Sequence, residues 1–157
     1  MDQPEIEIYP IPLFPTLSVT DVAASLDWYT NRVGFVSAYS LPMPGGGLAM
    51  AHVRWRKYAD LLLVPDTSPS DAAQPKGIGV AFSLLVDTTS VDEMAANLVS
   101  NGVEIAEGPV NRPWNTRDIV VHDPDGYRLV FFEAVDITRS FEDVMGDVSD
   151  SVAGDSG

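Results

Sequence analysis

The sequence predicts an α+β fold of two tandem βαβββ modules that form a curved, funnel-like mixed sheet with the helices outside. Three observations predict it. Short apolar segments alternate with period two, and two amphipathic helix patterns interrupt them. The two glycines that end these helices, Gly34 and Gly102, lie 68 residues apart. The same offset brings the strand at Phe14 onto the strand at Phe82, which indicates an internal duplication.

The first module is expected at residues 11–66. Leu17 and Val19 alternate with polar neighbours, as in a strand with one buried face. Asp21 is suited to cap a helix, and Gly34 supplies the left-handed residue that ends it. The strands of this module are expected at 14–19, 35–39, 50–55 and 60–64, with a Pro/Gly-rich loop at 41–47.

The second module is expected at residues 78–134, after a breaker-rich linker at 67–77. Ser90 and Glu93 have the spacing of a capping box, and the helix that follows ends at Gly102. The strands are expected at 80–86, 103–106, 117–122 and 127–132. Outside the modules we expect an N-terminal extension at 1–10 and an acidic tail at 135–157, with a short helix near 138–148.

Composition excludes several classes of function. The chain has no cysteine, so a catalytic thiolate, a Cys–zinc site and disulfides are ruled out. Its formal net charge of −14 opposes binding to nucleic acid and to anionic lipid. The first residues lack the basic and apolar regions of a signal peptide, and no apolar run is long enough to span a bilayer. We expect a soluble cytoplasmic protein.

Residues 11–134 resemble the vicinal oxygen chelate superfamily, also named glyoxalase/bleomycin resistance protein/dioxygenase. The resemblance rests on an ordered set of motifs: Pro15–Asp21, Trp28-Tyr29 with Gly34-Phe35, and Asp123-Pro124-Asp125-Gly126-Tyr127. Pro15 and the Pro113-Trp114 pair look most like the bleomycin-resistance branch. The resemblance implies a ligand held in the concave space of the sheets, and a homodimer.

The resemblance also implies where enzymes of the superfamily hold a divalent metal. The four ligand positions fall at Phe14, at Gly79 or Val80, at Leu62 or Asp60, and at Val130. Hydrocarbon side chains offer no lone pairs to a metal, and Asp60 alone among them could ligate. We therefore expect no metal and no other cofactor, and the usual metal-dependent chemistry of the superfamily is disfavoured.

A metal-free binding cavity is the leading interpretation. We expect its ligand to be a small molecule, a planar or cationic natural product that Trp114 could stack on, and the protein to act as an antibiotic-sequestering resistance protein. The expected ligand-binding residues are Phe14, Thr16, Tyr39, His52, Arg54, Asp60, Phe82, Trp114 and Val130. Two alternatives stay open. One is a lyase, isomerase or dioxygenase-type enzyme with an atypical metal or a His52/Asp60 pair; the other is an interaction module that docks through its tail.

Overall fold

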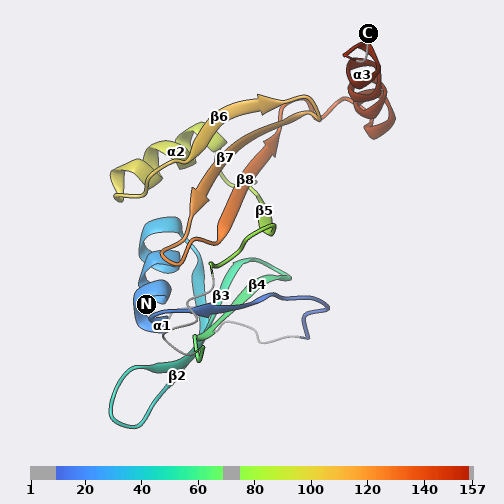
Figure 1. The fold of residues 1–157 in the computed structure, drawn as a ribbon. Coiled ribbons are helices and arrows are strands. Elements are labelled where there is room, and N and C mark those ends of the chain that lie inside the picture. Colours follow the sequence, from blue (N-terminus) through green and yellow to red (C-terminus); the bar gives the residue numbers. More distant parts are fainter. Residues whose placement is uncertain (1–9, 69–74, 156–157) are drawn as a thin grey trace. The chain divides into compact units, whose positions relative to one another are not determined.

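The structure is a computed structural model that describes residues 10–68 and 75–155 (Figure 1). Most of the expected N-terminal extension and the middle of the expected linker therefore lie outside the described residues. The remainder forms two four-stranded mixed sheets, each with one sequence of βαβββ elements. The predicted pair of α+β modules is confirmed.

The first module begins with a short strand and a capped helix. Its elements are β1 (Thr16–Val19), α1 (Val22–Asp27) continuing as the π-helical segment η1 (Trp28–Val33), β2 (Val36–Pro42), β3 (Leu48–Arg56) and β4 (Ala59–Pro65). The Asp21 side chain accepts a hydrogen bond from the Ala24 amide, and Gly34 follows η1 at φ +106°. The cap and the stop predicted for this helix are both present. The strand order is β1-β4-β3-β2, with β1 parallel to β4.

The second module repeats this arrangement. Its elements are β5 (Ala81–Leu85), α2 (Val91–Ser100), β6 (Glu107–Arg112), β7 (Thr116–His122) and β8 (Arg128–Ala134), and α3 (Phe141–Gly154) follows. The strand order is β5-β8-β7-β6, with β5 parallel to β8. Ser90 caps α2 by accepting from the Glu93 amide, whereas the Glu93 carboxylate is bonded to the Thr89 hydroxyl. Half of the expected capping box is therefore present.

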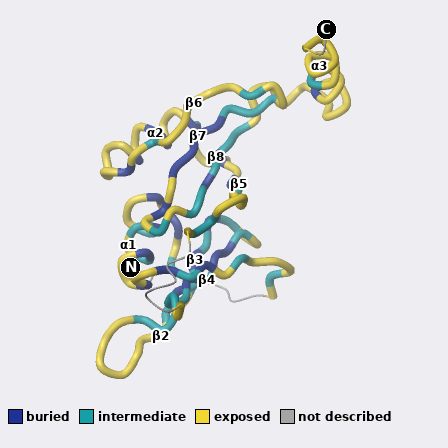
Figure 2. Tube along the Cα trace, in the orientation of Figure 1, coloured by how far each residue is buried: buried dark blue, intermediate teal, exposed yellow. Residues whose placement is uncertain are grey.

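The core of each module lies between one face of its sheet and its helix. Figure 2 shows buried residues concentrated in the central strands β3, β4, β7 and β8. On β3 and β8 they occupy alternate positions, as expected for strands with one covered face: Ala51, Val53 and Trp55 on β3, and Leu129 and Phe131 on β8. On β7 the four consecutive residues 118–121 are buried. The opposite face of each sheet is free of its helix and carries the more polar residues.

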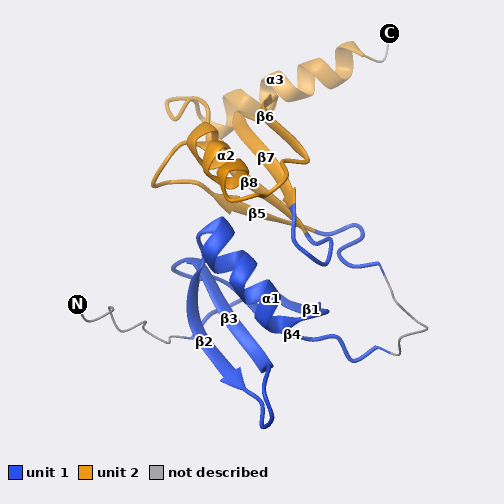
Figure 3. Cartoon of the chain, turned by 90° about the vertical axis from the view of Figure 1, so that its left-hand side faces the viewer, with its two compact units in different colours: residues 1–80, 122–127 blue, residues 81–121, 128–157 orange. Residues whose placement is uncertain are grey.

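Chain contacts divide the protein into two compact units, coloured separately in Figure 3. Unit 1 comprises residues 1–80 and 122–127, and unit 2 comprises residues 81–121 and 128–157. The turn at 122–127 belongs to unit 1 because its polar groups bond there. Asp125 accepts from Thr20, and the Tyr127 hydroxyl donates to the Ser18 carbonyl at 2.9 Å.

Two expectations about individual strands were wrong. Residues 103–106 form no strand; the strand begins at Glu107 and runs to Arg112. Gly108 and Pro109 disfavour a strand in sequence terms, but β6 lies at the edge of its sheet, where a missing amide donor is tolerated. The loop expected at 41–47 is also shorter, because β2 continues to Pro42 and β3 begins at Leu48.

Candidate functional site

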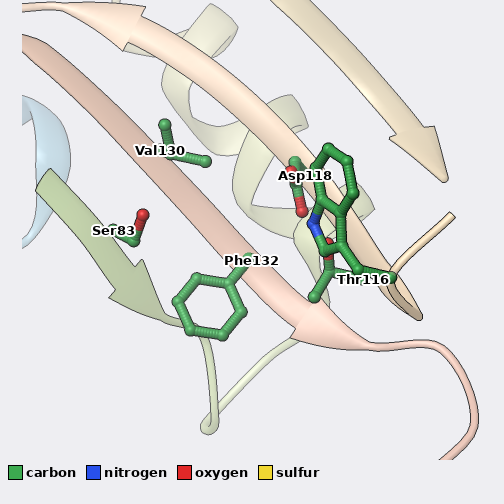
Figure 4. A pocket seen from close by; sticks show the side chains of 6 residues that line it. Ser83, Thr116, Asp118, Val130 and Phe132 are labelled. Atoms are coloured by element: carbon green, nitrogen blue, oxygen red, sulfur yellow. The ribbon is translucent and has the colours of Figure 1, made fainter. Parts of the chain in front are cut away.

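A cavity of about 230 Å³ lies on unit 2. Its walls come from the face of the second sheet opposite α2, and Figure 4 shows the labelled side chains along β5, β7 and β8. Strand alternation explains the set, because positions two apart share a face. Ser83 is the register partner of Val130, and both lie on this face. The lining residues are Ser83, Trp114, Thr116, Asp118, Val130 and Phe132.

Trp114 stands at the rim of this cavity, in the turn between β6 and β7. The side chain is 51% exposed, so it does not serve as a core residue. The turn itself is fastened by its neighbour Asn115, which adopts φ +68°. The Asn115 side chain donates to the Asp136 carbonyl at 2.8 Å and accepts from the Asp136 amide at 3.0 Å. The exposed indole of Trp114 therefore lies in a turn whose backbone is fixed by two hydrogen bonds to Asp136.

The cavity wall contains a buried carboxylate. Asp118 is 5% exposed, and its Oδ2 accepts from Arg112 Nε at 3.3 Å. Arg112 also lies 3.6 Å from Glu107, which accepts a closer bond from Arg128 at 2.8 Å. The contact with Arg128 holds the pKa of Glu107 below its ordinary value. The arginine nearest Asp118 is therefore shared between two carboxylates.

A second polar cluster lies on unit 1, on the helix-free face of the first sheet. Asp60 is 2% exposed and accepts two hydrogen bonds from Arg54, from Nε and from Nη2, each at 2.8 Å. His52 Nε2 lies 2.7 Å from Asp60 Oδ2, although within the described residues it makes no hydrogen bond of regular geometry. The predicted His52/Asp60 pair is thus in contact, with Arg54 as a third member.

Other predicted residues of the first module surround this cluster. The Phe14 ring lies 5.9 Å from the His52 ring, and Tyr39 is opposite His52 in the β2–β3 register. Thr16 is the register partner of Leu62 on the same sheet. Tyr39 lies within β2, in the strand expected at 35–39, and this strand continues to Pro42.

The second module gives a mixed outcome for the predicted residues. Trp114 and Val130 line the cavity, whereas Phe82 does not. Phe82 is the register partner of Leu129, on the face opposite to Val130, and Ser83 takes the place expected for it. Thr16 pairs with Leu62 in the first sheet, and Ser83 pairs with Val130 in the second. Leu62 and Val130, on the last strands, are therefore 68 residues apart, whereas Thr16 and Ser83, on the first strands, are 67 apart.

Sequence reasoning also missed Ser83, Thr116, Asp118 and Phe132. A signal for Asp118 was present, since an acidic residue in a predicted strand is unusual. Alternation then places Thr116 beside it on one face, and it places Phe132 beside Val130 in the same way.

The residues present do not fit the metal site that the resemblance implies. Within 10–68 and 75–155, no group of three or more His, Asp or Glu side chains could hold a metal ion. Asp60, the one candidate ligand, is already engaged by Arg54. Among the same residues, no helix has the length and hydropathy needed to cross a bilayer.

Comparisons with known proteins agree with this architecture. A family model described as the Glyoxalase/Bleomycin resistance protein/Dioxygenase superfamily matches residues 13–131. A similar structure is a glyoxalase/bleomycin resistance protein from Streptomyces sp. CB03234, with 29% identity, coverage of 76% of this chain and 97% of that one, and a TM-score of 0.58.

Two further structures are similar. TnmS3, an antibiotic binding protein from the same Streptomyces, has 28% identity, coverage of 81% and 97%, and a TM-score of 0.61. TioX from Micromonospora sp. ML1 has 20% identity, coverage of 78% and 97%, and a TM-score of 0.60, so it supports the fold alone. The comparison with curated proteins gave no match.

Proposed function

Because the chain belongs to the glyoxalase/bleomycin resistance protein/dioxygenase superfamily, we propose that it binds a small molecule without metal, as an antibiotic-sequestering protein. The proposal rests mainly on the unit 2 cavity, which Trp114 borders with an exposed aromatic side chain. The turn that contains Trp114 is fixed by hydrogen bonds from Asn115 to Asp136. Sequestration requires affinity and abundance and needs no catalytic group, so a partly apolar cavity of this kind suffices. The similarity to TnmS3, named as an antibiotic binding protein, supports the same class of function.

The test is titration of the full chain with a panel of planar antibiotics, monitored by Trp fluorescence and by calorimetry. We expect saturable binding, quenching of Trp114 emission and recovery of the unchanged antibiotic by mass spectrometry. A Trp114→Phe variant assigns the signal, because Trp28 and Trp55 remain in it. Binding that leaves Trp114 emission unaltered would move the site away from the cavity.

The absence of a cofactor is part of the proposal and has its own test. Elemental analysis of untagged protein should find divalent metals far below one per chain, and a chelator should leave antibiotic binding unchanged. Stoichiometric zinc, iron, nickel or manganese would contradict it.

We also propose that the chain is a homodimer in the cytoplasm. Analytical ultracentrifugation tests the oligomeric state, and cell fractionation tests the location. A monomer at micromolar concentration would contradict the first part of this proposal.

One observation favours a second candidate, an enzyme of the same fold. His52 Nε2 lies 2.7 Å from the buried carboxylate of Asp60, a spacing found in general-base pairs. Consumption of a substrate that is lost in His52→Ala, while antibiotic binding at the unit 2 cavity persists, would establish this candidate. Unchanged compound in every reaction mixture would leave sequestration as the function.

A further inference from the structure

Two polar atoms in the wall of the unit 2 cavity are buried without a partner. Within the described residues, Thr116 Oγ1 and Asp118 Oδ1 make no hydrogen bond. A buried acceptor left unsatisfied costs about 1–3 kcal/mol, and native proteins carry few such atoms. Both atoms belong to residues that line one cavity, so a bound molecule with donors could satisfy them together.

Asp118 has the stronger need for a donor. Among the described residues, Arg112 Nε is its one hydrogen-bond donor, 3.3 Å from Oδ2. A charge-assisted hydrogen bond is usually shorter, about 2.7–2.9 Å, so the arginine neutralises this carboxylate incompletely. Arg112 is drawn at the same time toward Glu107. Oδ1 of Asp118 is therefore a buried carboxylate oxygen in the cavity wall that no described group of the chain bonds.

The two acceptors come from neighbouring positions on one strand, so a single molecule can contact both. Thr116 and Asp118 are two residues apart on β7, which places their Cα atoms about 7 Å apart with both side chains on one face of the strand. A carboxylate accepts only, whereas a hydroxyl can donate or accept. Trp114 and Phe132 supply aromatic surfaces beside them, suited to the faces of a flat ring.

We propose that the cavity selects planar heteroaromatic compounds that carry an N–H donor on one edge, and most strongly a cationic one. Asp118 Oδ1 accepts the hydrogen bond from that edge, and Thr116 Oγ1, two residues earlier on the same face of β7, bonds a second polar group. Trp114 covers the ring face. This inference rests on the proposed function. It adds that the site selects its ligand by an N–H donor on the edge of the ring.

Two probes of nearly equal size and shape test the inference. Quinoline is neutral near pH 7 and has no donor, whereas 4-aminoquinoline is protonated on its ring nitrogen and donates from both nitrogens. We expect the wild-type chain to bind 4-aminoquinoline at least about tenfold more tightly by calorimetry, since a hydrogen bond to a charged group supplies that difference. Asp118→Asn should reduce the preference to about twofold or less and leave quinoline affinity unchanged.

Two further variants complete the design. Thr116→Val should weaken the binding of 4-aminoquinoline by a few fold, and it serves as a second test if Asp118→Asn fails to fold. Glu104→Gln removes an equal charge from an exposed position outside the cavity. It should keep the full preference, which separates a local hydrogen bond from attraction to the acidic surface.

The outcomes separate this inference from the function beneath it. Equal affinities for the two probes, together with quenching of Trp114, would overturn the donor selectivity and leave the binding function standing. A preference that survives in Asp118→Asn, or disappears in Glu104→Gln, would overturn the role of Asp118. No binding of either probe, or of any antibiotic in the panel, by the folded chain would overturn both.

Discussion

The Tyr29 hydroxyl donates a hydrogen bond of 2.8 Å to Oδ2 of Asp123, a residue 94 positions away in the sequence. Both residues are buried, with exposed fractions of 0% and 4%. Asp123 Oδ1 accepts from the amides of Asp125 and Tyr127, each at 2.9 Å. A tyrosine of η1 thus completes the bonding of the turn at 122–127, and this explains why that turn belongs to unit 1.

Replacing Tyr29 with Phe should destabilise the protein by about 1–3 kcal/mol, because it removes the donor to a buried carboxylate and leaves the ring in place. Urea denaturation gives the free energy of unfolding. Thr20→Val is the matched control at the same turn. The Thr20 hydroxyl donates to Asp125 at the exposed surface, so water can take over this hydrogen bond in the variant. We expect a smaller loss there, below about 1 kcal/mol. If both variants lost the same free energy of unfolding, burial of the Tyr29–Asp123 hydrogen bond would not explain its contribution.

Stability should also depend on the ionisation of Asp123. Burial raises the pKa of Asp123 above its ordinary value of 3.8, although the bonds from Tyr29 and the two amides oppose the rise. The folded state therefore holds this proton more tightly than the unfolded chain does. The resulting stabilisation is fully present below pH 3.8 and is lost as the pH rises through the folded pKa.

The measurement is urea denaturation of wild type and Asp123→Asn over a series of pH values. Asparagine mimics the protonated form at every pH, so the wild type should lose stability relative to the variant as the pH rises through this window. A difference that shifts in favour of the wild type with rising pH would mean that Asp123 has a lowered pKa.

The Asp60 cluster should tolerate neutralisation poorly. Asp60→Asn leaves the Arg54 guanidinium beside a neutral amide in a mostly buried position, and breaking a buried pair in this way costs about 3–5 kcal/mol. Asp92→Asn is the control, because the Asp92–Arg117 pair is exposed to solvent and should contribute much less to stability. Thermal unfolding of both variants checks the contrast, and similar small effects would show that water reaches Asp60.

Gly108 controls the approach of β6 to β7. A Cβ at this position would lie 2.3 Å from the carbonyl oxygen of Asp118, and φ is +85°. Gly45 has a similar φ of +87° with open space around it. Gly45→Ala should therefore cost about 1–2 kcal/mol from backbone strain alone. Gly108→Ala should cost more and also weaken ligand binding, because β7 must shift; denaturation and calorimetry report the two effects.

The sequence predicted the framework of this fold because local chemistry fixes it. Asp21 and Ser90 cap helices through their own side chains, and Gly34 and Gly102 end them at positive φ. The error at 103–106 arose because β6 is an edge strand containing Gly108 and Pro109. Its pairing with β7 determines the strand, and local propensity does not.

The candidate site was predictable only in part. Val130, which the 68-residue repeat placed on β8, lines the cavity on the helix-free face of its sheet. Phe82 was assigned by the same offset, yet β5 is shifted by one residue, and a one-residue shift turns every side chain of a strand to the other face. The role of Asp118 could not be predicted from the sequence, because only the structure shows that its Oδ1 is buried without a hydrogen-bond donor among the described residues.

Trp114→Ala should separate binding from stability. The side chain is 51% exposed, so its loss should change the free energy of unfolding by no more than about 0.5 kcal/mol. Stacking of an aromatic on a ligand ring contributes about 1–3 kcal/mol, which corresponds to a loss of affinity of about 5- to 150-fold. Asn115→Gly keeps the positive φ and removes both bonds to Asp136, so it should weaken binding through the turn. Calorimetry with a bound antibiotic measures each effect. A Trp114→Ala variant that is strongly destabilised yet binds normally would show that the indole covers the core and is not part of the site.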